Sequence, residues 1–99
     1  MQAEAHMRMG QNAEALDIVN QVRASRGAGA LSSLDETGLL AERGRELYWE
    51  GHRRTDLLRF GRFLDAWEEK PASGEERLLF PIPAISLAGN PNLVQNPGY

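Results

Sequence analysis

The chain has 99 residues, no cysteine and a formal net charge of −3 at pH 7. A domain of this length buries roughly 60–70% of the surface of its unfolded chain, so a small core is expected. Its 41% hydrophobic and 25% charged residues exclude a wholly disordered or fibrous chain. The acidic balance argues against nucleic acid as a partner, and the lack of cysteine excludes disulfides, thiol nucleophiles and cysteine-based zinc sites.

Residues 1–26 predict a pair of helices. Residues 2–9 are rich in good helix formers, and Gly10 lies where a left-handed residue would end the first helix. Asn12 is a suitable cap for a second helix. Apolar residues recur there at helical spacing, at Ala15, Ile18, Val19 and Val22. The short turn between the two helices predicts an antiparallel hairpin.

Residues 33–68 predict two further helices. The sequence SLDE at 33–36 has the pattern of a capping box, in which the Ser33 hydroxyl and the Glu36 carboxylate satisfy free amide groups at a helix start. This third helix is expected to weaken at Gly51. A fourth helix is expected from Thr55, because an apolar stripe follows at Leu57, Phe60, Leu64 and Trp67.

The C-terminal part, residues 71–99, contains all five prolines of the chain, so regular helix there must be short. Pro83 is suited to open one helical turn that Asn90-Pro91 would end. Residues 92–99 are expected to be irregular and to lie on the surface. The predicted fold class is therefore all-α: a tetratricopeptide-like helical hairpin (1–26), two further helices (33–68) and an irregular, proline-rich tail (71–99).

The carboxylates Glu42, Glu46 and Glu50 are the first candidates for acid–base catalysis, but they follow one another along one helix face. Glycosidases need two carboxylates that face each other about 5–10 Å apart across the substrate. These glutamates are therefore interpreted as a solvated or salt-bridged face. His6 and His52 are the only histidines and form no recognised metal motif. No catalytic residue, metal ligand or cofactor is predicted, and ligand-binding residues are left open.

The aromatic residues are candidates for sugar binding, because sugar rings stack on exposed aromatic faces. The spacing assigns Trp67 to the apolar stripe of the fourth helix. Tyr48 and Trp49, beside Gly51, are expected to cover a neighbouring helix. None of the three is predicted to contact a ligand.

Residues 42–59, ERGRELYWEGHRRTDLLR, closely resemble the signature of the SusD/RagB family, E-R-x-R-E-L-x-x-E-G-x-R-x-x-D-L-x-R. The segments LFPIP (79–83), NPNL (90–93) and QNPGY (95–99) are similar to the usual ending of that family. Residues 4–23 resemble the helix pair that precedes the signature. Gly44, where an arginine is common, is a small departure. The similarity covers nearly the whole chain and corresponds to the C-terminal region of the family.

The resemblance implies a binding protein rather than an enzyme. Members of this family are largely helical lipoproteins at the cell surface that bind a glycan or other nutrient and work with a TonB-dependent, SusC-like outer-membrane transporter. This chain shows no signal or lipidation site, and its helix-like pattern begins directly at Met1, so it is interpreted as a monomeric fragment of a longer protein that serves mainly as scaffold. The alternative is a free-standing tetratricopeptide-like module that binds proteins through its helical groove.

Within the signature, Glu46, Glu50, Arg53 and Asp56 are predicted to form a structural motif. Arg53 and Asp56 are three residues apart and can share one helix face. A bend at Gly51 would bring Glu46 or Glu50 within reach of the Arg53 guanidinium, closing charge-assisted hydrogen bonds across the corner.

Overall fold

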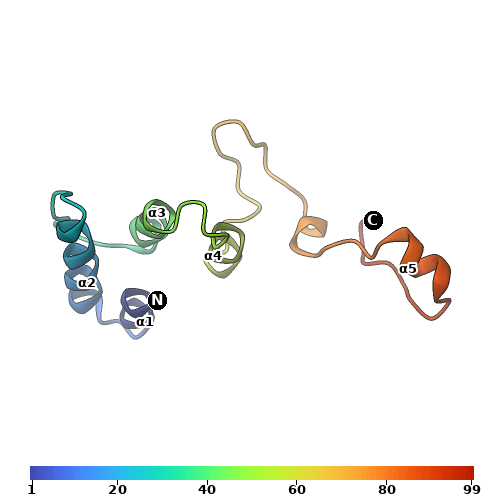
Figure 1. Cartoon of the computed structure of the whole chain (residues 1–99), viewed down its shortest axis with the longest axis horizontal. Helices are drawn as coiled ribbons and strands as arrows, with labels where there is room; N and C mark the ends of the chain where they lie inside the picture. The colour runs from blue at the N-terminus through green and yellow to red at the C-terminus, as the bar shows by residue number, and fades with distance from the viewer. The chain divides into compact units, whose positions relative to one another are not determined.

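The computed structural model describes all residues from 1 to 99 and contains five α-helices, one 3-10 helix and no strand. The prediction of an all-α fold is confirmed, whereas the tetratricopeptide-like nature of the first two helices stays a prediction. The chain divides into two compact units, residues 1–56 and residues 57–99, whose helices are labelled in Figure 1. No helix has both the length and the apolar character needed to cross a membrane.

The first unit begins with α1 (Gln2–Arg8) and α2 (Asn12–Ser25), which pack against each other. Their buried apolar residues are Ala3, Ala15 and Val19. Two of these three are alanines, which let the helix backbones approach closely. The residue before α2 is Gln11, and no side chain caps the helix, so the prediction that Asn12 is the cap is wrong.

Three helices end in the same way, at Gly10, Gly27 and Gly61. Each glycine has a positive φ, between 65° and 77°, which costs glycine little because it has no Cβ atom. In α4 (Arg53–Arg59) the Arg62 amide then donates to the Leu57 carbonyl at 2.8 Å. This hydrogen bond belongs to the Schellman motif, in which a left-handed residue stops the helix and satisfies its last carbonyl groups.

The prediction that the fourth helix continues to Trp67 is therefore wrong, because Gly61 ends it. Beyond Gly61 the chain forms turns, and Trp67 pairs with Lys70 through two backbone hydrogen bonds of 2.9 and 2.7 Å. The Trp67 side chain is 47% exposed, with the Lys70 ammonium 4.6 Å from its ring centroid. Trp67 is not part of a helical core stripe.

The third helix, α3 (Glu36–Glu46), is capped by Asp35, whose Oδ1 accepts a hydrogen bond from the Gly38 amide at 2.6 Å. The predicted capping box at Ser33 is wrong by two residues, since an aspartate carboxylate was available next to the first helical residue. On its inner face α3 buries Leu39 and Leu40. These leucines complete the apolar core of the first unit.

The second unit contains the end of α4, the 3-10 helix η1 (Glu75–Leu78) and α5 (Ala84–Gly89). Pro83 directly precedes α5 and Asn90 ends it, as predicted. Residues 92–99 are irregular, also as predicted. Leu57 is the only buried residue of this unit, so its segments are held together mainly by hydrogen bonds.

Candidate functional site

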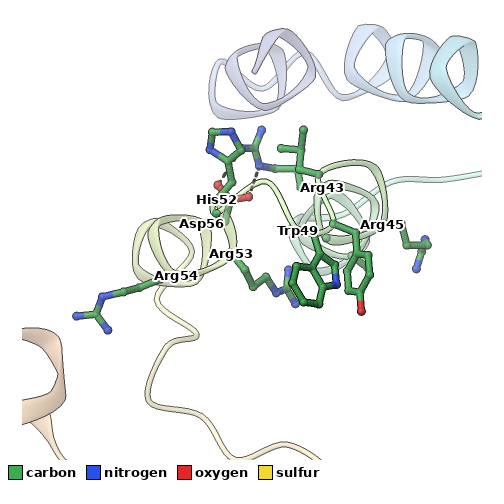
Figure 2. A pocket seen from close by; sticks show the side chains of 12 residues that line it. Arg43, Arg45, Trp49, His52, Arg53, Arg54 and Asp56 are labelled. Carbon is green, nitrogen blue, oxygen red and sulfur yellow. Dashed lines mark hydrogen bonds and ion pairs between the residues drawn. The ribbon is translucent and has the colours of Figure 1, made fainter.

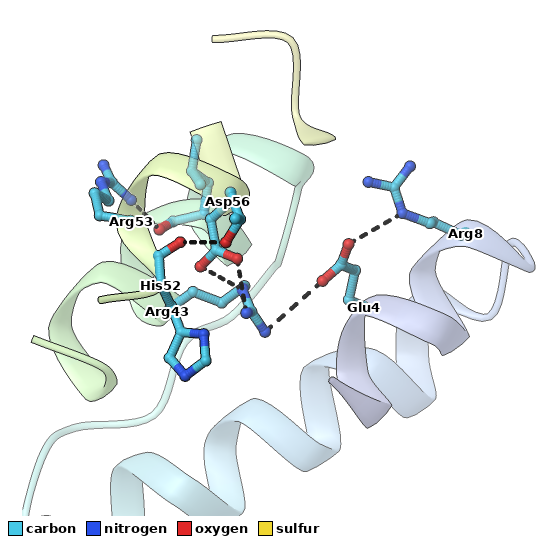
Figure 3. A network of polar contacts seen from close by, with 8 residues as sticks. Glu4, Arg8, Arg43, His52, Arg53 and Asp56 are labelled. Carbon is cyan, nitrogen blue, oxygen red and sulfur yellow. Dashed lines mark hydrogen bonds and ion pairs between the residues drawn. The ribbon is translucent and has the colours of Figure 1, made fainter. Parts of the chain in front are cut away.

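The first unit contains a buried network of charged side chains (Figure 3). At its centre Arg43 of α3 makes a bidentate pair with Asp56 of α4: Nε lies 2.9 Å from Oδ2 and Nη2 lies 2.8 Å from Oδ1. The third guanidinium nitrogen, Nη1, lies 3.7 Å from Glu4 Oε2 of α1. Glu4 also accepts a hydrogen bond from Arg8 at 3.2 Å. One arginine thus joins three helices of the chain.

The burial of these charged groups indicates a structural rather than a catalytic role. Asp56 is 1% exposed, and Arg43 and Glu4 are buried as well. Removing such charges from water costs free energy, and this cost is offset only because the paired groups have good hydrogen-bond geometry. A carboxylate held on both oxygens by a guanidinium has no free face toward a substrate. The network therefore fixes how the helices meet and does not resemble an acid–base pair.

Of the four residues predicted as a structural motif, only Asp56 lies in this network. The Arg53 guanidinium instead donates to the Leu40 carbonyl at 2.9 Å. Glu46 pairs with Arg26, the residue directly after α2, at 2.6 Å. Glu50 is exposed. The predicted pairing of Glu46 or Glu50 with Arg53 is therefore wrong.

The actual position of Arg53 depends on Gly44. A Cβ atom at residue 44 would lie 2.9 Å from Nη1 of Arg53, so the absence of a side chain lets the guanidinium lie against α3. With Arg53 bonded to a backbone carbonyl, Glu46 pairs instead with Arg26.

Sequence reasoning missed Arg43 and Glu4, although a signal was present. Arg43 follows Leu39 by four residues and Leu40 by three, so it shares a helix face with both leucines. An arginine on a face otherwise buried by leucines requires a carboxylate partner. That requirement pointed to a buried ion pair with Arg43 but did not say which carboxylate supplies it.

At the surface, the Arg26–Glu46 pair changes the titration of both groups. The hydrogen bond from the Arg26 guanidinium is the main cause that lowers the pKa of the Glu46 carboxyl. The same hydrogen bond raises the pKa of Arg26 above its ordinary value. Both shifts stabilise the charged forms, so Glu46 stays ionised at neutral pH and is a poor proton donor.

A pocket of about 740 Å³ opens beside the turn between α3 and α4 (Figure 2). Two aromatic side chains of this turn are exposed, Tyr48 at 75% and Trp49 at 88%. Their ring centroids are 6.1 Å apart and their planes are nearly perpendicular, at 80°. The prediction that they cover a neighbouring helix is wrong. The α3 helix ends at Glu46, so the turn directs both rings outward from the helix.

No group of three or more histidine, cysteine, aspartate or glutamate side chains lies close enough to hold a metal ion. The fold and the site define an all-α protein whose buried charges join helices and whose pocket beside the α3–α4 turn is lined by two aromatic residues. The chain matches the family model described as the SusD family over residues 1–75. It belongs to the SusD family.

Two curated relatives are similar to the chain. One is the SusD-like protein P38 of Formosa agariphila, 30% identical over 112 residues, which cover 100% of this chain and 22% of the relative. The other is the starch-binding protein SusD of Bacteroides thetaiotaomicron, 34% identical over 107 residues, which cover 98% of this chain and 19% of the relative. The chain spans about a fifth of the length of either relative.

Proposed function

We propose that this chain is the C-terminal helical segment of a glycan-binding lipoprotein at the bacterial cell surface, and that the segment serves mainly as scaffold. The observation that carries the proposal is that practically the whole chain aligns with a protein named for starch binding. The family membership supports binding rather than cleavage as the activity. The protein containing the chain would work with a TonB-dependent, SusC-like transporter in the outer membrane.

The scaffold role is supported by the ion pairs that connect the helices of the segment. Arg43, the most buried cation, is engaged by Asp56 and Glu4. The glutamates Glu42 and Glu46 of α3 accept hydrogen bonds from Arg23 of α2 and from Arg26, the residue directly after α2. These four carboxylates hold helices together, which leaves no pair of them facing a substrate.

Two measurements on the full-length protein test the proposal. Calorimetric titration with maltooligosaccharides and other common glycan fragments should detect reversible binding without release of shorter products. Purification from outer membranes through an affinity tag should recover a TonB-dependent barrel with the protein. Steady hydrolysis of any glycan, or a protein that binds none of them and recovers no barrel, would contradict the proposal.

A further inference from the structure

The pocket beside the turn between α3 and α4 has three features that the scaffold role does not explain. Tyr48 and Trp49 are largely exposed, although burying large aromatic side chains is normally favourable. Trp49 has a φ of +66° and is the only non-glycine residue of the chain with a positive φ. Strained backbone of this kind persists where surrounding structure enforces it, and it is concentrated at binding and catalytic sites.

Most of the charged residues that line the pocket are cations, in a chain that is acidic overall. Four arginines and one aspartate are among its lining residues, and that aspartate, Asp56, is already paired with Arg43. Arg45 shares the carboxylate of Glu42 with Arg23, each at 2.6 Å, so two guanidinium groups face one carboxylate. Arg53 bonds to a carbonyl and makes no ion pair. Arg53 is thus a cation of the pocket without a carboxylate partner.

Exposed aromatic faces beside a guanidinium group without a carboxylate partner favour a particular class of ligand. In Figure 2 the Arg53 side chain extends toward the Trp49 ring, whereas Arg54 extends away from it. A sugar ring can stack on an indole face, and a guanidinium binds a carboxylate with two parallel hydrogen bonds. The volume of about 740 Å³ is sufficient for a short oligosaccharide, because ligand pockets measure about 300–1,000 Å³.

We propose that this pocket is a subsite for an acidic saccharide, in which a uronic acid ring stacks on Trp49 and its carboxylate binds the Arg53 guanidinium. The proposal rests on the proposed function, since a glycan-binding protein would bring saccharides to this face. It goes beyond that function in placing a ligand contact on the scaffold segment and in naming a charge preference.

Fluorescence of Trp49 gives a direct test on the 99-residue chain. The chain has two tryptophans, so Trp67→Phe leaves Trp49 as the only reporter. Titration with a galacturonic acid trisaccharide should change its emission and saturate, whereas maltotriose, a neutral trisaccharide, should bind about tenfold more weakly or not at all, the difference expected from losing a charge-assisted hydrogen bond. Equal responses to both sugars, or none to either, would overturn the proposal.

Two variants and a control are then compared in the full-length protein by calorimetry. Trp49→Gly fits the left-handed backbone and removes the stacking surface. Arg53→Gln keeps a hydrogen-bond donor for the Leu40 carbonyl but removes the charge. Both should weaken binding of the acidic trisaccharide about tenfold. Arg62→Gln, which removes an exposed arginine paired with Asp65, should leave its affinity unchanged.

The outcomes separate this subsite from the proposed function. If the full-length protein binds glycans and both variants retain native affinity for the acidic trisaccharide, the pocket is no subsite and the proposed function stands. Acrylamide should quench the fluorescence of Trp49 in the full-length protein. If it does not, other parts of that protein cover the ring; the pocket is then no subsite, and the proposed function stands. If the native protein binds no glycan at all, both proposals fail together.

Discussion

The two units of the chain are stabilised in opposite ways. In residues 1–56 apolar side chains from three helices form a core, and a buried ion network lies beside it. In residues 57–99 the apolar side chains Phe80, Ile85 and Val94 are exposed, and only Leu57 is buried. The same 99 residues thus contain a packed helical unit and a segment held by hydrogen bonds.

Side-chain amides replace a core in the second unit. The Gln95 amide group exchanges two hydrogen bonds with the backbone of Ile82, accepting at 2.8 Å and donating at 2.9 Å. Asn96 donates to the Phe80 carbonyl at 2.7 Å, and the Tyr99 hydroxyl donates to the Leu79 carbonyl at 3.1 Å. Hydrogen bonds contribute about 0.5–1.5 kcal/mol each. The second unit should therefore open before the first.

Asp56→Ala should have the largest effect on stability. It leaves the buried Arg43 guanidinium without its bidentate partner, and breaking a buried pair in this way costs about 3–5 kcal/mol of unfolding free energy. Urea denaturation followed by circular dichroism measures the loss. Replacing both partners by apolar residues, with Arg43→Met and Asp56→Leu, should be less harmful than Asp56→Ala alone, because no unpaired charge then remains.

Two further single variants give reference values for the loss of unfolding free energy in Asp56→Ala. Arg53→Ala removes a hydrogen bond to a carbonyl and should cost about 1 kcal/mol. Glu69→Ala, on an exposed residue, should change stability by less than about 0.5 kcal/mol. If all three single variants have equal, small effects, the Arg43–Asp56 pair is not buried in solution and the scaffold role assigned to it is wrong.

Gln95→Ala should open the second unit alone. It leaves the Ile82 amide and carbonyl without their partners, at a cost of about 1–3 kcal/mol. Hydrogen exchange read by NMR should show lost protection at the amides of Ile82 and Asn96, which both donate to Gln95 Oε1. Protection of the Leu39 and Leu40 amides in α3 should stay at its native level. Lost protection in α3 as well would show that the two units unfold as one.

Trp49→Gly should stabilise the first unit slightly. An exposed side chain contributes little packing, and a non-glycine residue with a positive φ destabilises by about 1 kcal/mol. The melting temperature should therefore rise by a few degrees, since about 1 kcal/mol corresponds to about 4–8 °C in a domain of this size. A fall in melting temperature would indicate that the Trp49 ring is packed in solution, as the sequence had predicted.

Sequence rules worked where a local signal decides the structure. Gly10 and Pro83 marked helix ends correctly, because backbone φ preferences act within a few residues. The same glycine rule, applied to Gly61, would have ended the fourth helix correctly, but the apolar spacing through Trp67 outweighed it. The spacing of apolar residues indicates which of them would share a helix face if a helix formed. It does not show that the helix forms.

The candidate site was harder to predict because its contacts are non-local. Arg43 and Asp56 are thirteen residues apart, and the turn at 47–51 decides that they meet. Four carboxylates near the signature compete for several arginines, and sequence spacing favours none of the pairings. The burial of Arg43 decides which carboxylate pairs with it, since a buried guanidinium pairs with a carboxylate that can be buried beside it.

The Arg26–Glu46 pair should contribute little to stability, and the sign of its pH dependence follows from the pKa of Glu46. The Glu46 carboxyl has a pKa below its ordinary value of 4.5 because Arg26 donates hydrogen bonds to the ionised form. The ion pair therefore contributes its full stabilisation at pH values above the pKa that Glu46 has in the unfolded protein. This contribution is lost as the pH falls through the lower pKa that Glu46 has in the folded protein. Comparing native protein with Glu46→Gln isolates this contribution, since glutamine has a similar shape and does not titrate. The difference in unfolding free energy between the two proteins should be larger at pH 7 than at pH 3, and it should shrink in 1 M salt because the pair is exposed. A difference that is the same at both pH values would mean that Glu46 and Arg26 do not pair in solution.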